Sequence, residues 1–233
     1  MTAHALQPAR LHETVGVVCD LLRGQVACRN VVQVEEELRY ELVACLLGSQ
    51  VRAESADAAQ YRLSCAGLLS DERWRSRDNA FENEVADHLA NRFPTSASKS
   101  SYRFPSLRAR QLAQLRTVLQ AEPLSSRLAP SCDARRVRAK LVQDLPGIGP
   151  KQASMFMRNV GASYDVAILD VHVLSFFQRI GLLTVSGSAV STLKTYEKTE
   201  TVANAYAVRC GHPVGYLDWA IWITMRAAKE LEA

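Results

Sequence analysis

Residues 145–151 read Leu-Pro-Gly-Ile-Gly-Pro-Lys, the most informative stretch of the chain. Two glycines flank one apolar residue, Ile148, between two segments with helical periodicity. Glycine permits left-handed backbone and leaves amide groups uncovered, while Ile148 can anchor the turn in a core. Pro150 suits the first position of a following helix because its φ is fixed. The stretch predicts a helical hairpin whose second helix presents free amides and a positive dipole end, where a phosphate can bind.

Apolar residues recur at steps of three and four on both sides of this hairpin, which is the period of an amphipathic helix. Helices are expected at 31–48, 57–69, 79–92, 105–119, 133–143, 150–160, 171–183, 192–210 and 216–230, with a loop at 93–101 and Gly161 as a helix stop. No run alternates with period two. The pattern therefore predicts an all-α fold of about ten helices.

The chain has 233 residues, 48% hydrophobic and 22% charged, which is ordinary for a soluble globular protein of one large domain or two small lobes. Its net charge of +4 is a mild basic excess that does not by itself indicate nucleic acid. The N-terminus lacks the pattern of a signal peptide, and no stretch approaches the roughly 20 apolar residues of a membrane span. We expect an intracellular protein without a membrane partner, in the cytoplasm or nucleoid, or in the nucleus of a eukaryote.

The cysteine pattern argues against a bound metal. No two of the six cysteines stand at C-x-x-C spacing: Cys19, Cys28, Cys45, Cys65, Cys132 and Cys210. Zinc and iron–sulfur sites need clustered ligands, so no metal site is expected. In a reducing compartment these residues are expected to be thiols, most of them buried as small hydrophobes.

Two charged residues stand where chemistry is possible. Lys151 falls in the first turn of the helix after the hairpin, where a cation opposes the helix dipole, so it does not serve helix stability. It can contact a phosphate or act as a nucleophile, since partial desolvation near a positive helix end favours the reactive neutral amine. Asp170 precedes another helix at the N-cap position. It can be only a cap, or also a carboxylate that serves Lys151.

The wider context of these residues resembles a known superfamily. The chain resembles the helix-hairpin-helix DNA glycosylases in LPGIGPKQASMFMRNVG at 145–161, followed by AILDVHVL at 167–174. Bifunctional members of that superfamily carry a catalytic lysine at the end of the hairpin and an aspartate eighteen or nineteen residues later. Asp170 lies nineteen residues after Lys151. ELVACLLGSQVRAES, YRFPSLRAR and GYLDWAIW are similar to the compact second family of 8-oxoguanine DNA glycosylase/AP lyases. The resemblance runs from about Glu37 to Trp222.

The resemblance implies an architecture and a function. It implies two helical lobes, a barrel at 36–160 that ends in the hairpin and a second lobe from 1–35 plus 161–233, with the active site in the cleft between them. Lys151 and Asp170 would stand on opposite walls and together excise 8-oxoguanine through a Schiff base. The expected partner is double-stranded DNA that contains oxidised guanine, and the protein is expected to act as a monomer. No cofactor is implied, and binding of a monovalent cation by the hairpin carbonyls remains an alternative.

The remaining site residues follow from the same resemblance. Those expected at the DNA backbone are Gly147, Gly149, Lys140 and His172, with Lys140 on a helix whose basic outer side also includes Arg135, Arg136 and Arg138. Those expected at the base pocket, or filling the gap left by a flipped nucleotide, are Gln50, Met155, Asp218 and Trp222. A helix cap for Gln50, a helix surface for His172 and a core position for Trp222 remain alternatives.

Two other functions are weighed against this one. Relatives that act on oxidised pyrimidines or mispaired adenine usually carry four clustered cysteines after the aspartate, and only Cys210 lies there. The adenine-specific branch also lacks a lysine at the position of Lys151. A helix-hairpin-helix protein that only binds DNA needs neither Lys151 nor Asp170. We therefore expect a glycosylase for 8-oxoguanine, with another oxidised base or simple DNA binding as the alternatives.

Overall fold

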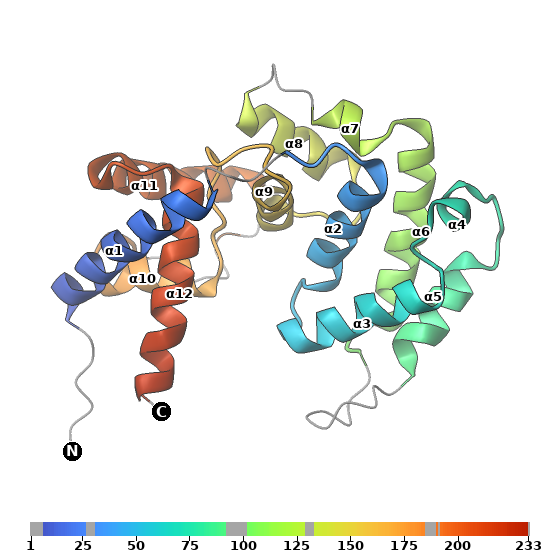
Figure 1. Ribbon diagram of the computed structural model, residues 1–233, viewed down its shortest axis with the longest axis horizontal. Helices are drawn as coiled ribbons and strands as arrows, with labels where there is room; N and C mark the ends of the chain where they lie inside the picture. The colour runs from blue at the N-terminus through green and yellow to red at the C-terminus, as the bar shows by residue number, and fades with distance from the viewer. Residues whose placement is uncertain are drawn as a thin grey trace. The chain divides into compact units, whose positions relative to one another are not determined.

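The computed structural model describes residues 7–26, 31–91, 102–128, 133–184, 190 and 192–232. These residues form twelve helices and no strand (Figure 1). The expected all-α fold is confirmed. The loop expected at 93–101 lies outside the described residues, and so do Cys28 and Cys132.

The chain divides into two compact units. The middle unit comprises Val32–Ile148, and the terminal unit comprises Met1–Val31 and Gly149–Ala233. The division differs from the expected one at 149–160, which belongs to the terminal unit, and at 32–35, which belongs to the middle unit. The reason is visible in Arg158, whose Nη1 lies 2.7 Å from Asp218 Oδ1 in the same unit. Lys151 and Asp170 therefore belong to one unit, and not to two different lobes.

The middle unit holds seven helices, α2 (Glu35–Leu47), α3 (Ala53–Cys65), α4 (Asp71–Arg75), α5 (Phe81–Ala90), α6 (Pro105–Ala121), α7 (Leu124–Arg127) and α8 (Ala134–Asp144). The α5 helix packs along α6, and α2 packs against α3, α6 and α7. The sequence analysis missed α4 and α7 because helices of five and four residues are too short to display a period.

Several arginines are buried in this unit, and one of them corrects the sequence analysis. Arg138 was expected on the basic outer side of its helix, yet it is fully buried. It lies on the same face of α8 as Leu141, since residues three apart are neighbours on a helix. Arg127 is also buried, and it pairs with Glu122 at 2.9 Å and with Asp144 at 2.8 Å. Two charged residues of α8, Arg138 and Asp144, therefore take part in the packing of the unit.

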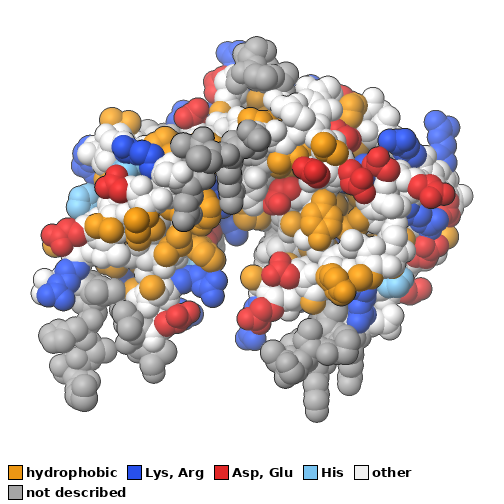
Figure 2. All heavy atoms as spheres, viewed as in Figure 1, with side chains coloured by type: hydrophobic (Ala, Val, Ile, Leu, Met, Phe, Trp, Pro, Cys, Tyr) orange, Lys and Arg blue, Asp and Glu red, His pale blue; other side chains and the backbone are white. Residues whose placement is uncertain are grey.

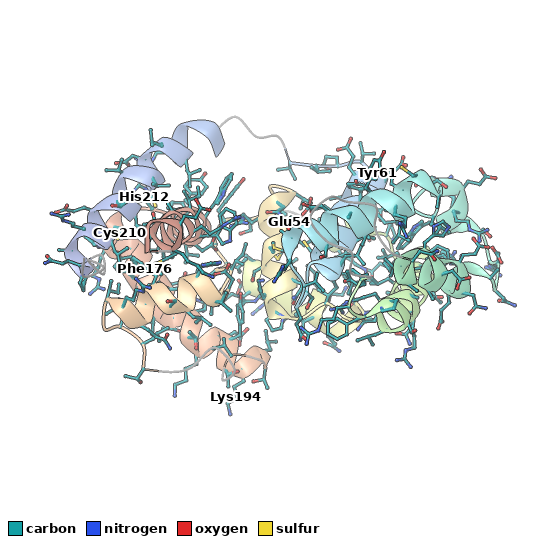
Figure 3. The ribbon with its side chains drawn as sticks, turned by 90° about the horizontal axis from the view of Figure 1, so that it is seen from below. Glu54, Tyr61, Phe176, Lys194, Cys210 and His212 are labelled. Atoms are coloured by element: carbon teal, nitrogen blue, oxygen red, sulfur yellow. The ribbon has the colours of Figure 1, made fainter. Side chains whose placement is uncertain are left out.

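The terminal unit holds five helices, α1 (Pro8–Val26), α9 (Pro150–Asn159), α10 (Val171–Arg179), α11 (Leu193–Cys210) and α12 (Val214–Glu232). The α12 helix is its centre, because α1, α10 and α11 all pack against it. Figure 1 shows α1 lying along α12, so segments from the two ends of the sequence are neighbours. Phe176, labelled in Figure 3, packs edge-to-face on Tyr206 with ring centroids 5.8 Å apart in the core of this unit.

The described cysteines follow the expectation only in part. Cys19 and Cys45 are buried thiols, but Cys65, the last residue of α3, is exposed. Within the described ranges no group of three or more histidine, cysteine or acidic side chains is arranged to hold a metal ion. None of the described helices combines the length and hydropathy needed to cross a membrane. On the face shown in Figure 2, acidic and basic side chains are interspersed.

Candidate active site

The hairpin geometry explains its two glycines. Gly147 has φ of 80°, a left-handed conformation that side chains rarely adopt. A Cβ there would lie 2.6 Å from the side chain of Gln111 and 2.7 Å from that of Leu46. Only glycine therefore fits this position. Ile148, between the glycines, is only 3% exposed and anchors the turn as expected.

The helix after the hairpin begins without a capping side chain. Its N-cap is Gly149, which has no side chain to accept from the amides of the first turn, and its first residue is Pro150. Lys151 follows as the second residue of α9 and is half-buried. Across the described parts of the chain, its amine has no hydrogen-bond or ion-pair partner. The helix end can therefore accept an anion while the amine stays available.

Asp170 serves as a cap and still keeps one oxygen open. Its Oδ1 accepts from the backbone N–H groups of His172 at 2.9 Å and Val173 at 2.8 Å, which caps α10. Its Oδ2 makes no hydrogen bond to any described residue. The side chain is half-buried. A structural cap and a reactive carboxylate are therefore compatible in this one residue.

The segment at 167–169 that leads to Asp170 is buried and has no regular secondary structure. Side chains from α11 satisfy its backbone. Glu200 Oε1 accepts from Ala167 N at 2.8 Å. The Tyr196 hydroxyl accepts from Leu169 N at 2.9 Å and donates to the Ala167 carbonyl at 2.7 Å. The sequence analysis missed both residues, although a glutamate four residues after a tyrosine on one buried helix face was a usable signal.

Asp218 of α12 completes the support of this segment. Its Oδ2 accepts from Ile168 N at 2.6 Å, and its Oδ1 pairs with Arg158 of α9 at 2.7 Å. The carboxyl is only 3% exposed, and burial raises its pKa to about 7 although Arg158 opposes this rise. Both oxygens thus have partners inside the terminal unit, which gives no support to the expected role of Asp218 in the base pocket.

Met155 and Trp222, the expected walls of the base pocket, are half-buried residues of the terminal unit. Met155 lies one helical turn after Lys151 on α9, on the same side of the helix. Trp222 lies on α12, and the guanidinium of Arg226 stacks 4.9 Å from the centroid of its ring. His172 is half-buried, and its backbone N–H donates to the capping carboxylate of Asp170.

Two expected DNA contacts besides Gly147 lie in the middle unit. Lys140 is exposed, and its Nζ is 3.5 Å from Glu122 Oε1, a weak surface pair that a phosphate can replace. Gln50 is exposed and has φ of 63°, the one positive value for a non-glycine residue in the described ranges. Arg108 holds the backbone beside it by donating to the Ser49 carbonyl at 2.9 Å. Such unfavourable backbone geometry in a non-glycine residue often marks a functional position.

Comparison with known proteins identifies the family of the chain. The model of the family described as 8-oxoguanine DNA glycosylase matches residues 27–212. The chain is 34% identical over 195 residues to an 8-oxoguanine DNA glycosylase/AP lyase of Saccharolobus islandicus, covering 83% of this chain and 84% of the relative. A relative with the same description from Korarchaeum cryptofilum is 29% identical over 188 residues, covering 81% and 79%.

Solved structures agree with the sequence comparisons. The 8-oxoguanine DNA glycosylase of Thermotoga maritima aligns with a TM-score of 0.71 at 26% identity, covering 93% of this chain and 96% of that one. A Methanocaldococcus jannaschii 8-oxoguanine glycosylase/lyase, solved with DNA that contains 8-oxoguanine, has the same fold with a TM-score of 0.63 at 20% identity, covering 91% and 87%. Since the family model spans most of the chain, this protein belongs to the 8-oxoguanine DNA glycosylase family.

Proposed function

We propose that this protein excises 8-oxoguanine from duplex DNA and then cleaves the strand, with Lys151 as nucleophile and Asp170 as the essential carboxylate. The observation that carries the proposal is that one unit presents both groups, the available amine of Lys151 at the N-terminus of α9 and the open carboxylate oxygen of Asp170 at the N-terminus of α10. The names of the relatives support the substrate and both activities. We propose that the enzyme acts where its DNA substrate lies, in the nucleoid or in the nucleus of a eukaryote.

DNA binding would begin at the uncapped start of α9. The first-turn amides and the helix dipole attract a phosphate without reading sequence. The target nucleotide must leave the base stack, because C1′ of a stacked nucleotide is out of reach. Gln50, exposed on its unusual backbone, is proposed to fill the space that the flipped nucleotide leaves.

The chemistry then proceeds in two steps. The neutral amine of Lys151 forms a bond to C1′ while the bond from C1′ to the base breaks, and the base leaves with the electron pair and takes up a proton. The sugar ring opens to a Schiff base between Nζ and C1′. Loss of a proton from C2′ then shifts electrons to break the bond from C3′ to its phosphate oxygen. Water releases the lysine, and the scheme uses no metal or redox cofactor.

Asp170 acts through its open oxygen in this scheme. The Oδ1 atom stays with the helix cap, and Oδ2 faces the developing positive charge on the sugar and accepts a proton from the lysine. A carboxylate held by two backbone amides does not need to reorganise during the reaction. The cap therefore contributes orientation, and the second oxygen contributes the chemistry.

The substrate is tested by borohydride trapping with a panel of duplexes that carry 8-oxoguanine, guanine, thymine glycol or mispaired adenine. We expect the covalent adduct and base release to be fastest by far with 8-oxoguanine. The lesion presents N7–H where guanine presents an acceptor, and a buried acceptor left unpaired by guanine costs about 1–3 kcal/mol. A faster reaction with thymine glycol would replace the substrate but keep the lysine chemistry. Binding without any adduct would favour the non-catalytic alternative.

Trp222 is proposed as a wall of the base pocket. Trp222→Ala should lose most base release from 8-oxoguanine but keep strand cleavage at a pre-formed abasic site, because the second step needs Lys151 and no base. Single-turnover rates on the two substrates measure this. Trp222→Phe keeps an aromatic surface and should retain much of the base release. Equal losses in both steps of Trp222→Ala would show that the residue belongs to the core.

A further inference from the structure

The segment before Asp170 depends on side chains for its geometry. Buried backbone amides must be paired, and residues 167–170 form no helix or strand that could pair them. Glu200, Tyr196 and Asp218 supply the partners, as described above. The position of the Asp170 carboxylate therefore follows from these contacts made far along the chain as well as from its cap bonds with His172 and Val173.

Asp218 differs from a simple support because it also bonds the helix of Lys151. Its second oxygen pairs with Arg158, seven residues after Lys151 on α9. Seven residues are almost two full turns, so Arg158 and Lys151 lie on the same side of a rigid helix. On the other side of Asp218, Ile168 is two residues from Asp170. One buried carboxylate thus connects the supports of both proposed catalytic residues.

The ionised form of the Asp218 carboxylate adds little to the stability of the fold at neutral pH. Burial raises the pKa of Asp218 to about 7, so the folded state holds the proton more tightly than the unfolded chain does. A raised carboxyl pKa stabilises the fold below about pH 4 and loses that contribution as the pH rises through about 7. At neutral pH and above, a buried ion pair is often no better than apolar packing. A functional reason for the charge is therefore the better explanation.

We infer that Asp218 is a positioning residue for the reaction, which sets the Asp170 segment against the helix that carries Lys151. This inference rests on the proposed function. Reactive groups displaced by about 1 Å can lose on the order of a hundredfold in rate, so a link of this kind has a measurable consequence. Asp218 acts through Arg158 and Ile168, because each of its carboxylate oxygens is bonded to one of them.

The decisive variant is Asp218→Asn. Asparagine offers one acceptor oxygen, so it can satisfy Ile168 or Arg158 while its amide group meets the other donor. At pH 8, with 8-oxoguanine duplex and with a pre-formed abasic site, we expect both single-turnover rates to fall by roughly 10- to 100-fold. Both should fall alike, because both steps use Lys151 and Asp170. The trapped amplitude, which counts active molecules, should stay normal.

Thr224→Val is the matched control. Thr224 is a buried residue of the same helix, and its hydroxyl has no hydrogen-bond partner among the described residues. The exchange keeps the shape and should leave both rates unchanged. A loss of base release alone in Asp218→Asn would make Asp218 a pocket residue and overturn the inference. A lower amplitude with an unchanged rate would make it purely structural, with the same consequence.

A double-mutant cycle tests the link itself. Arg158→Met removes the same contact from the other side, so it should slow both steps, and the double variant should be hardly slower than the worse single variant. Losses that multiply would show two independent roles and overturn the inference. If the wild type is active and the rates of Asp218→Asn are unchanged, the positioning role is wrong but the proposed function stands. A wild-type chain that cleaves neither substrate rejects the proposed function, and the inference with it.

Discussion

Lys151→Gln is expected to form no borohydride-trapped adduct with 8-oxoguanine duplex, while its affinity for the same DNA stays within a few-fold of wild type. Glutamine has no nucleophilic amine, so no Schiff base can form. The uncapped amides of α9 that are proposed to bind phosphate remain in place, since they belong to the backbone. Trapping on a denaturing gel and a binding titration measure the two properties separately.

Lys194→Gln is the matched control for this experiment. Lys194 is also the second residue of a helix, α11, and it is exposed (Figure 3). The substitution removes the same charge from the same position in a helix, and trapping should remain normal. An adduct of ordinary yield from Lys151→Gln would show that another amine is the nucleophile.

Asp170→Asn is expected to fold with near-normal thermal stability and to lose several powers of ten in the rate of base release. Asparagine caps helices about as well as aspartate, so the bonds from His172 and Val173 can persist and the free energy of unfolding should change by less than about 1 kcal/mol. The lost charge no longer stabilises the cationic sugar, and the proton acceptor is gone. Thermal unfolding and single-turnover rates test the two parts.

Asp133→Asn provides the comparison for Asp170→Asn. Asp133 caps α8 in the same manner and accepts from Arg135 N at 2.9 Å, but nothing assigns it to the chemistry. Its substitution should change neither stability nor rate appreciably. If Asp170→Asn turns over at near wild-type rate, Asp170 is a cap and the carboxylate of the reaction must be sought elsewhere.

The features that the sequence predicted well depend on interactions between residues that are close together in the chain. The left-handed backbone of Gly147 and the capping of α10 by Asp170 depend on residues within one turn of each other. Gly161 also has a left-handed φ, 74°, where a helix stop was expected. Local backbone sterics and capping hydrogen bonds leave such direct marks on a sequence.

The partners of buried charges could not be predicted in this way. Arg138 reads as part of a basic helix surface and is in fact buried, because the side of a helix that faces the core is decided by packing against distant residues. The sequence shows Asp218 near Trp222 but does not show its partners Arg158 and Ile168, 60 and 50 residues away. A desolvated charge takes whichever partner the fold brings near, and sequence spacing does not reveal which one that is.

The sequence by itself determined the all-α class, the hairpin with its glycines, and the identity of Lys151 and Asp170 as the residues to test, since these follow from periodicity, backbone sterics and motif. Only the tertiary structure decided that α9 joins the terminal unit, so that Lys151 and Asp170 share one compact body. It also decided that Tyr196, Glu200 and Asp218 hold the segment before Asp170. The physical reason is that buried amides and carboxylates must pair, and they pair through space with groups that the chain brings together only when it folds.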